Sequence, residues 1–372
     1  MNPLVVLVTG AYGQVGKQLV EILLSRGHHV VASDLHTEVA EAAAEALSRT
    51  DHPGKLTTVY ADLLHPEAMV RIVEHHMPTA IAHLAGMYPP LSYRNPRLAR
   101  RISVDGASNL IRAAQTLSSS PFVVFASSAA VYGSRNPVKH PELITTNTPT
   151  NPVDQYGEDK TMAEDVIVKS GLPYAILRLG GVISPDTTRG AGKDHLLLMR
   201  ATPGNNRLHT VDSRDAGMAF ANALERRETV TGRVLLIAGD DSHRRKHRDV
   251  EDDMMAAFGI GRLGESASLP GDPDDERGWS FTGWFDTSEA QELLNFQQHS
   301  WNQTVTWVTE SKAHLRPVLT AIGPVLRATI RLALVAQRGW ERRGPYADPW
   351  TLIEKHYGTG ALAARRNPAN PT

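Results

Sequence analysis

The opening of the 372-residue sequence constrains the fold more than any other stretch. An apolar run from Leu4 to Val8 leads into a turn with three glycines, and residues 17–24 then follow helical spacing. A strand, a Gly-rich turn and a helix bring backbone N–H groups and a helix N-terminus to one point, which attracts a pyrophosphate. The pattern predicts a dinucleotide-binding site formed by Gly10, Tyr12, Gly13, Gln14, Val15 and Gly16.

Strands and helices alternate along the first half of the chain. Apolar runs predict strands at residues 28–34, 56–63, 79–86, 122–128 and 174–185. The segments between them predict helices at residues 38–49, 66–76, 97–117 and 152–170. Such alternation indicates right-handed βαβ units. We therefore expect an α/β fold of the Rossmann type, with a doubly wound parallel sheet and a smaller C-terminal substrate-binding lobe.

Asp34 ends the second predicted strand, about 20 residues after the glycine turn. A carboxylate there can accept hydrogen bonds from both ribose hydroxyls of an adenosine. It would also repel a 2′-phosphate, so the sequence favours NAD over NADP. Asp34 can equally cap the following helix, and the two roles are compatible.

Side chains that handle protons follow the fifth predicted strand. That strand ends in Ser127 and Ser128, while Tyr156 and Lys160 lie four residues apart on one face of the next helix. A phenol is a poor base at neutral pH, but an adjacent ammonium favours the phenolate. We predict that Tyr156 exchanges a proton with a substrate oxygen held by Ser128, with Ser127 as the alternative serine. His83 also ends a strand, where a packed, hydrogen-bonded role is more common than a catalytic one.

Composition excludes several classes of function. A net charge of −1 provides no overall field that would recruit nucleic acid. The absence of cysteine excludes disulfides and thiolate chemistry. Because the first strand begins at Leu4 and no apolar run is long enough to cross a bilayer, we expect a cytoplasmic protein. No histidine spacing matches a zinc motif, so we expect no metal.

Together these motifs resemble those of the short-chain dehydrogenase/reductase superfamily in its extended branch, the NAD-dependent epimerase/dehydratase family. The resemblance covers roughly residues 4–300 and is strongest before residue 185. It implies that NAD is the cofactor, that Asp62 and Leu63 flank its adenine, and that Leu84, Ala85 and Gly86 lie beside it.

The same resemblance assigns the catalytic roles. Ser128 matches the family's catalytic serine because it precedes Ala-x-Val-Tyr-Gly. Tyr156 would be the proton donor and acceptor. Lys160 would bind the nicotinamide ribose and lower the pKa of the tyrosine. Family members often pair through two helices, which implies a homodimer formed here by residues 97–117 and 152–170.

The sequence departs from the family's pattern at several positions. Ser103 stands where the family usually has an asparagine. Ser128 is followed by alanines rather than by the acid of the dehydratases, which argues against dehydratase activity. Gly180 and Gly181 replace an asparagine that helps to hold a nucleotide-sugar diphosphate. Arg207 is a candidate anion contact, although it lies one position from the family's diphosphate arginine.

Two reactions fit these residues. A dehydrogenase or reductase would release its product, whereas an epimerase would return the hydride to the other face of a ketone. The substrate could be a sugar nucleotide or a hydrophobic alcohol of steroid or polyketide type. A protein that only binds the cofactor, as a scaffold or sensor, is the alternative outside enzymes.

The sequence pattern divides the chain into three parts. We expect a Rossmann domain over residues 1–180, a substrate-binding lobe over 181–310 and a helical extension over 311–372. Residues 240–249 are expected to form a solvated loop. Residues 312–340 predict an amphipathic helix that packs on its own body or a partner, lids an apolar pocket or, least expected, lies on a membrane surface. Residues 365–372 are expected to be disordered.

Overall fold

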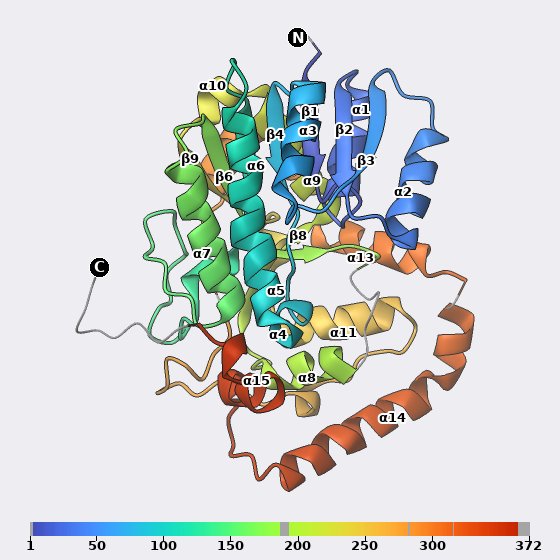
Figure 1. Ribbon diagram of the computed structural model, residues 1–372. Coiled ribbons are helices and arrows are strands. Elements are labelled where there is room, and N and C mark those ends of the chain that lie inside the picture. The colour runs from blue at the N-terminus through green and yellow to red at the C-terminus, as the bar shows by residue number, and fades with distance from the viewer. Residues whose placement is uncertain (1–2, 187–192, 282, 315, 364–372) are drawn as a thin grey trace, which may run out of the picture.

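A parallel sheet of seven strands forms the centre of the molecule (Figure 1). The computed structural model describes residues 3–186, 193–281, 283–314 and 316–363. The strand order is β3-β2-β1-β4-β5-β6-β9, and every neighbouring pair is parallel. This confirms the predicted Rossmann-type sheet. The strands are β1 (Val5–Thr9), β2 (His29–Asp34), β3 (Lys55–Tyr60), β4 (Ala80–His83), β5 (Phe122–Ser128), β6 (Tyr174–Leu179) and β9 (Arg233–Ile237).

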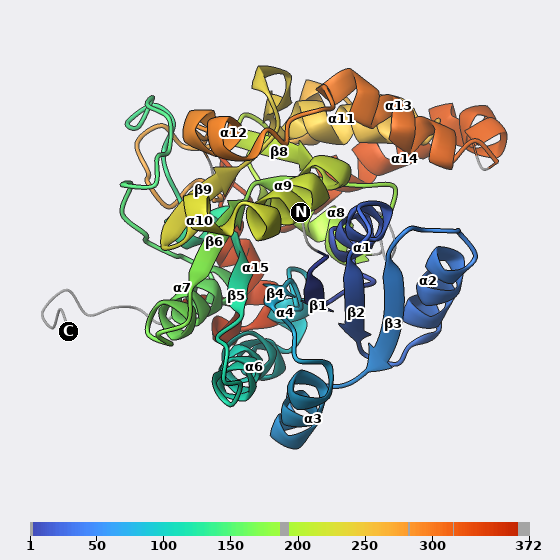
Figure 2. The ribbon, with the colours of Figure 1, turned by 90° about the horizontal axis from the view of Figure 1, so that it is seen from above.

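Helices cover both faces of the sheet because the apolar strand residues alternate between them (Figure 2). On one face, Val6 and Val8 lie in a core with Leu19 and Phe220, from α1 and α9. On the other, Leu7 packs with residues of α3, α6 and α7. The helices are α1 (Gly16–Ser25), α2 (Glu38–Ser48), α3 (Pro66–His76), α6 (Gly106–Gln115), α7 (Gln155–Val168), α9 (Ser213–Glu225) and α10 (Arg227–Val230).

Two predicted elements are interrupted. The helix expected at 97–117 is α5 (Pro96–Arg100), a π-helical segment η1 (Arg101–Asp105) and α6. The strand expected at 174–185 breaks at Gly180 into β6 and β7 (Gly181–Ile183). A Cβ on Gly180 would lie 2.3 Å from the carbonyl oxygen of His209, because the chain passes close to the next strand there. A separate small sheet, β10-β8-β7, follows, with β8 (Arg207–Asp212) and β10 (Arg244–Lys246).

The expectation of a solvated loop at 240–249 is wrong. This segment forms a 3₁₀ turn η3 (Asp241–His243), β10 and the start of α11 (His247–Ala257). His243 is fully buried, and its Nδ1 lies 2.9 Å from Thr210 Oγ1. Its Nε2 also lies 3.0 Å from the carbonyl oxygen of His299. These contacts join residues distant in the sequence, so the local polar pattern did not predict the ordered turn.

The C-terminal part adds several helices around the small sheet, and they lie below the main sheet in Figure 1. Near the C-terminus the chain packs against the main body, where Trp350 lies in an apolar cluster with Tyr93 and Val153. The predicted tail, 365–372, lies outside the described residues. The remaining elements are α4 (Leu91–Arg94), η2 (Ala129–Tyr132), α8 (Lys193–Ala201), η4 (Glu265–Ala267), α12 (Ser288–Leu294), α13 (Trp301–Ser311), α14 (Arg316–Trp340), α15 (Pro349–Tyr357) and η5 (Thr359–Ala361).

Candidate active site

The turn between β1 and α1 is too tightly packed for side chains at two of its glycines. Gly10 has φ +69°, and a Cβ on it would lie 2.7 Å from the backbone nitrogen of Ala85. A Cβ on Gly16 would lie 2.1 Å from the carbonyl oxygen of Gly10. Gly13 is less restricted, at 3.3 Å from the same oxygen. The turn therefore presents bare backbone at a helix N-terminus, which fits a pyrophosphate.

Asp34 lies beside this turn at the end of β2. Its Oδ2 accepts a hydrogen bond from the backbone N–H of Tyr12 at 2.9 Å, and its Oδ1 accepts one from Leu35 at 2.8 Å. The Tyr12 hydroxyl is held 2.6 Å from Thr58 Oγ1. These contacts fix the carboxylate in one orientation. Each of its oxygens keeps a lone pair for a ribose hydroxyl.

The other predicted cofactor residues follow the ends of neighbouring strands. Leu84 donates its backbone N–H to Thr9 at 3.0 Å, which places residues 84–86 alongside the glycine turn. Asp62 caps its own turn through the N–H of Leu64 at 2.9 Å. Leu63 is buried, and its carbonyl accepts from Asn109 at 2.9 Å. Because parallel strands end at a common edge, all these residues share one edge of the sheet.

Ser128, Tyr156 and Lys160 come together at the same edge. The Ser128 side chain lies close enough to Tyr156 to lower its pKa, and its Oγ accepts the backbone N–H of Ala130 at 3.2 Å. Lys160 Nζ donates to the carbonyl of Ala126 at 2.7 Å and lies 6.0 Å from the centre of the Tyr156 ring. A Cβ on Gly86 would lie 3.5 Å from this ammonium, so the segment after β4 borders the same space. The alternative serine, Ser127, instead contacts Glu164.

Burial sets the pKa values of these groups. Burial raises the pKa of Tyr156 to about 12, against the lowering effect of its hydrogen bond with Ser128. Burial lowers the pKa of Lys160 to about 8. In this structure desolvation of the phenolate outweighs the contributions that lower the pKa of Tyr156. That Lys160 lowers this pKa stays a prediction. Tyr156 carries its proton at neutral pH.

The N-terminus of α7 is fixed by a contact that the sequence analysis missed. Asp154 is fully buried, its Oδ1 accepts the N–H of Gly157 at 2.9 Å, and its Oδ2 accepts the Tyr93 hydroxyl at 2.5 Å. A Cβ on Gly157 would lie 2.4 Å from the carbonyl oxygen of Ala130. The first turn of α7, which carries Tyr156, therefore rests directly on the turn that follows Ser128. An Asp before a helix is a recognisable cap.

Replacing Asp154 with Asn is expected to change the pH dependence of stability. Burial raises the pKa of Asp154 from 3.8 to about 6, so its stabilising contribution is complete below the unfolded value and is lost as pH rises through about 6. The unfolding free energy of the parent, relative to Asp154→Asn, should fall by up to about 3 kcal/mol between about pH 4 and pH 7. Urea unfolding at several pH values measures this difference.

Asp212→Asn is the matched control for that measurement. Asp212 is also a buried helix cap, but hydrogen bonds from Arg214 and Thr304 lower its pKa against the effect of burial. The stabilising contribution of Asp212 is lost only as pH falls through its lowered pKa. The unfolding free energy of the parent relative to Asp212→Asn should therefore not fall between about pH 4 and pH 7. Parallel pH profiles for the parent and Asp154→Asn would contradict the raised pKa of Asp154.

His83 has a structural role, as predicted. It is buried, its Nδ1 lies 2.7 Å from Thr9 Oγ1, and burial lowers its pKa to about 3. It is therefore neutral, and it joins β4 to β1 beneath the glycine turn. Ser103 is also buried, on η1, and its Oγ has no hydrogen-bond partner among the described residues.

Arg207 has partners within the protein. Its guanidinium donates to the carbonyl of Pro141 at 2.9 Å and stacks on Trp284 at 4.7 Å. Its role as an anion contact stays a prediction. Asp215 accepts the backbone N–H of His299 at 3.0 Å and anchors the loop before α13.

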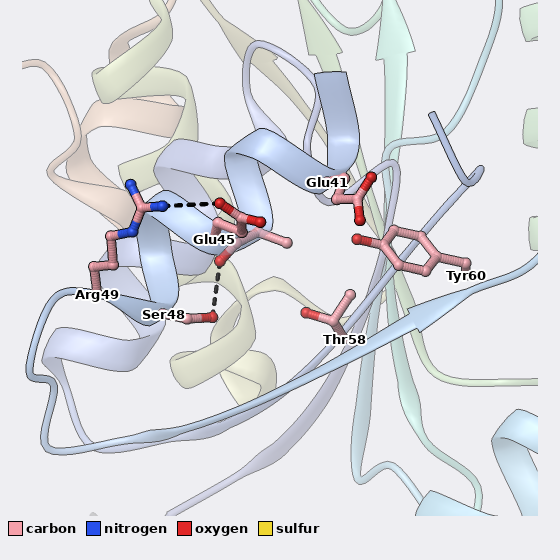
Figure 3. A pocket seen from close by; sticks show the side chains of 7 residues that line it. Glu41, Glu45, Ser48, Arg49, Thr58 and Tyr60 are labelled. Atoms are coloured by element: carbon pink, nitrogen blue, oxygen red, sulfur yellow. Dashed lines mark hydrogen bonds and ion pairs between the residues drawn. The ribbon is translucent and has the colours of Figure 1, made fainter. Parts of the chain in front are cut away.

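A cavity of about 530 Å³ lies elsewhere, between α2 and β3 (Figure 3). Thr58 and Tyr60 form one wall, and Glu45 pairs with Arg49 on the other at 2.9 Å. None of the predicted catalytic residues lines it. This hollow is therefore distinct from the edge where Ser128 and Tyr156 meet.

Comparison with known proteins identifies relatives of the chain. The sequence model of the NAD dependent epimerase/dehydratase family matches residues 6–257. UDP-glucose 4-epimerase of Erwinia amylovora is 32% identical over 165 residues, which are 44% of this chain and 47% of that protein. A 3-beta-hydroxysteroid dehydrogenase of Mycolicibacterium neoaurum is 33% identical over 186 residues, 48% of this chain and 47% of that protein. The chain thus spans about half the length of these curated relatives.

Solved structures show the same fold over more of the chain. The UDP-Glc/GlcNAc 4-epimerase from Campylobacter jejuni superposes with a TM-score of 0.67. The match covers 84% of this chain and 99% of that one at 20% identity.

Proposed function

The chain belongs to the NAD-dependent epimerase/dehydratase family, and from that premise we propose that it is an enzyme that transfers a hydride between a secondary alcohol or ketone carbon and NAD. One observation carries the proposal. The side chains of Ser128 and Tyr156 lie next to each other, with the Lys160 ammonium nearby, at the sheet edge that also carries the glycine turn. This arrangement supports a site that combines a proton donor, an oxygen-binding hydroxyl and a dinucleotide cradle.

Bound NAD would supply the hydride chemistry. The residues of the chain handle the oxygen and its proton. Tyr156 is protonated at neutral pH and can donate to a ketone oxygen as it becomes an alcohol. Ser128 can hold the same oxygen through its hydroxyl. In the reverse direction Tyr156 must first release its proton, and the Lys160 ammonium favours the phenolate formed.

Asp34→Asn is expected to weaken NAD binding by roughly tenfold to a hundredfold, because a hydrogen bond to a charged acceptor is lost. The amide oxygen can still accept the N–H of Tyr12, so the turn is retained. NADP binding should stay the same or strengthen, since the repulsive charge is removed. Titration calorimetry with both cofactors measures the change, and Asp51→Asn, in an exposed loop, is the control. Equal affinities of the parent for NAD and NADP would overturn the assignment of Asp34.

Two substrate classes are proposed within this reaction type. The Erwinia relative supports a sugar-nucleotide epimerase, and the Mycolicibacterium relative supports a dehydrogenase of a hydrophobic alcohol. Gly180 favours the second class. A Cβ there would meet the carbonyl oxygen of His209 at 2.3 Å, which leaves no room for the asparagine that the resemblance associates with a diphosphate.

An assay with both substrate classes tests the proposal. Mass spectrometry of the purified protein first identifies any retained NAD. UDP-sugars are then followed by product stereochemistry, and hydrophobic secondary alcohols by absorbance of the reduced nicotinamide. An epimerase would interconvert sugars without net reduction of NAD, whereas a dehydrogenase would accumulate reduced cofactor. Binding of NAD without turnover of either class would support the scaffold alternative.

We further propose a homodimer, formed through the helices at residues 97–117 and 152–170, and a cytoplasmic location. The family resemblance supports the dimer. The segment η5 already contacts α5 and α7, so it borders the surface through which the copies would pair.

A further inference from the structure

An amphipathic helix on a soluble protein usually packs its apolar face against the body. Helix α14 instead exposes its apolar face to solvent. It runs along the lower edge of the molecule, with α8 and α11 between it and the sheet (Figure 1). Its large apolar side chains are exposed: Val325 by 70%, Leu332 by 72% and Trp340 by 87%. Val318, Ile322 and Val335 are exposed as well. From Val318 to Val335 the spacings are three, four and seven residues, and Trp340 lies eight residues after Leu332, so the series shares one face of the helix, termed here the outer face.

The opposite face of α14 is bound to the body through arginines, and through Leu334, which packs with Met199 and Leu263. Arg331 donates to the carbonyl of Leu263 at 2.7 Å, and Arg338 donates to that of Ser266 at 2.9 Å. Arg327 donates to the carbonyl of Ile260. Gly323 permits close contact, since a Cβ on it would lie 2.9 Å from the same carbonyl oxygen. The apolar face is therefore directed away from the body by specific polar contacts.

The segment that carries the outer face is cationic. Four of its arginines bind carbonyls of the body, and the remaining cations lie at the two ends of the helix. Residues 312–343 contain seven Lys and Arg residues and a single acid, Glu341, although the whole chain has a net charge of −1. Glu341 is already paired with Arg200 at 2.5 Å. Arg316 and Arg342 lie exposed at the two ends of the helix. A second copy of this face would carry the same cations and no free acid, so two copies would repel each other.

We propose that α14 docks the protein on an anionic membrane surface, lying in the plane of the headgroups with its outer face toward the acyl chains. An apolar stripe with an exposed Arg at each end, and a Trp near one of them, has the chemistry of an interfacial helix. The exposed cations would meet acidic headgroups.

The same contacts exclude a membrane-spanning orientation. Among the described residues α14 is the one helix long and apolar enough, by length and composition, to cross a membrane, which differs from the expectation that no segment is. Its arginines, however, hold it along the body, and Trp301 of α13 and Trp350 of α15 are both buried in that body. The chain therefore returns to the body of the protein at both ends of α14, on the same side of any membrane.

The apolar surface extends beyond the helix itself. A cavity of about 600 Å³ lies between α8, α14 and α15, lined in part by Leu196, Leu197, Ala333 and Trp340. Trp340 thus belongs both to this cavity and to the outer face. Docking would cover both.

Vesicle flotation with the full chain tests the proposal without any enzymatic readout. Phosphatidylcholine vesicles are compared with vesicles that also contain phosphatidylglycerol. The parent should bind the anionic vesicles at least about tenfold better, and added salt should weaken this binding. The triple variant Val318→Ser, Val325→Ser, Leu332→Ser should lose the binding, because these side chains form the outer face.

A matched control replaces three apolar residues of similar exposure on other surfaces: Val39→Ser, Met77→Ser, Val138→Ser. This control should bind like the parent. Quenching of tryptophan emission by brominated lipid should decrease in Trp340→Phe, which reports contact of that residue with the bilayer. Thermal unfolding monitors the fold of each variant.

Two results would overturn the proposal. One is a parent that binds no better than the outer-face variant. The other is that the parent binds no vesicles and light scattering shows it to be a dimer, whereas the outer-face variant is a monomer. A second copy of the chain, rather than a membrane, would then cover the outer face. Membrane docking through α14 does not depend on the proposed reaction, so loss of turnover in another variant leaves this result unaffected.

Discussion

Tyr156→Phe is expected to bind NAD normally and to lose turnover by about 10²- to 10⁴-fold, the usual contribution of a positioned proton donor. The ring remains in place, because α7 is held by the Asp154 cap and by close contact of Gly157 with Ala130. Only the hydroxyl beside Ser128 is removed. Turnover with the substrate found for the parent, together with cofactor titration, separates loss of chemistry from loss of binding.

The rates of ketone reduction and of alcohol oxidation should differ in their pH dependence. Since the pKa of Tyr156 is raised to about 12, the phenol is protonated through the neutral range. Reduction of a ketone needs that proton, whereas oxidation of an alcohol needs it removed, so the oxidation rate should rise with pH. Tyr174→Phe is the control, because Tyr174 begins β6 at the opposite edge of the sheet. Unchanged turnover in Tyr156→Phe would remove Tyr156 from the mechanism.

The sequence predicted features that depend on neighbouring residues. The glycine turn, the strand that ends in Asp34 and the placement of Tyr156 and Lys160 on one helical face follow from spacing within about twenty residues. The Gly180 break was missed, because it depends on the approach of His209 from a distant strand. For residues 312–340 the pattern indicated an amphipathic helix. Which face turns outward depends on carbonyls at residues 260–266, and no local pattern reports these contacts.

A buried ion pair, which the sequence analysis did not predict, joins α7 to the sheet. Glu164 on α7 and Arg178 on β6 are both buried, with Nε to Oε1 at 2.9 Å and Nη2 to Oε2 at 2.6 Å. Arg178 also donates to the Tyr132 hydroxyl at 2.8 Å. Burial lowers the pKa of Arg178, but the hydrogen bonds and charge of Glu164 outweigh this and raise it. Ser127 contacts the same carboxylate, so the pair ties together the elements that carry Ser128 and Tyr156.

Arg178→Met is expected to lower the unfolding free energy by about 3–5 kcal/mol, because it leaves the Glu164 carboxylate buried without a partner. Adding Glu164→Leu should recover much of this loss, since the double variant buries no charge. Urea unfolding of the parent, both single variants and the double variant gives the coupling energy. Arg49→Met is the control. Its ion pair with Glu45 is also 2.9 Å long but exposed, so its loss should cost less than about 1 kcal/mol. Strictly additive losses in the buried pair would show that Glu164 and Arg178 act independently.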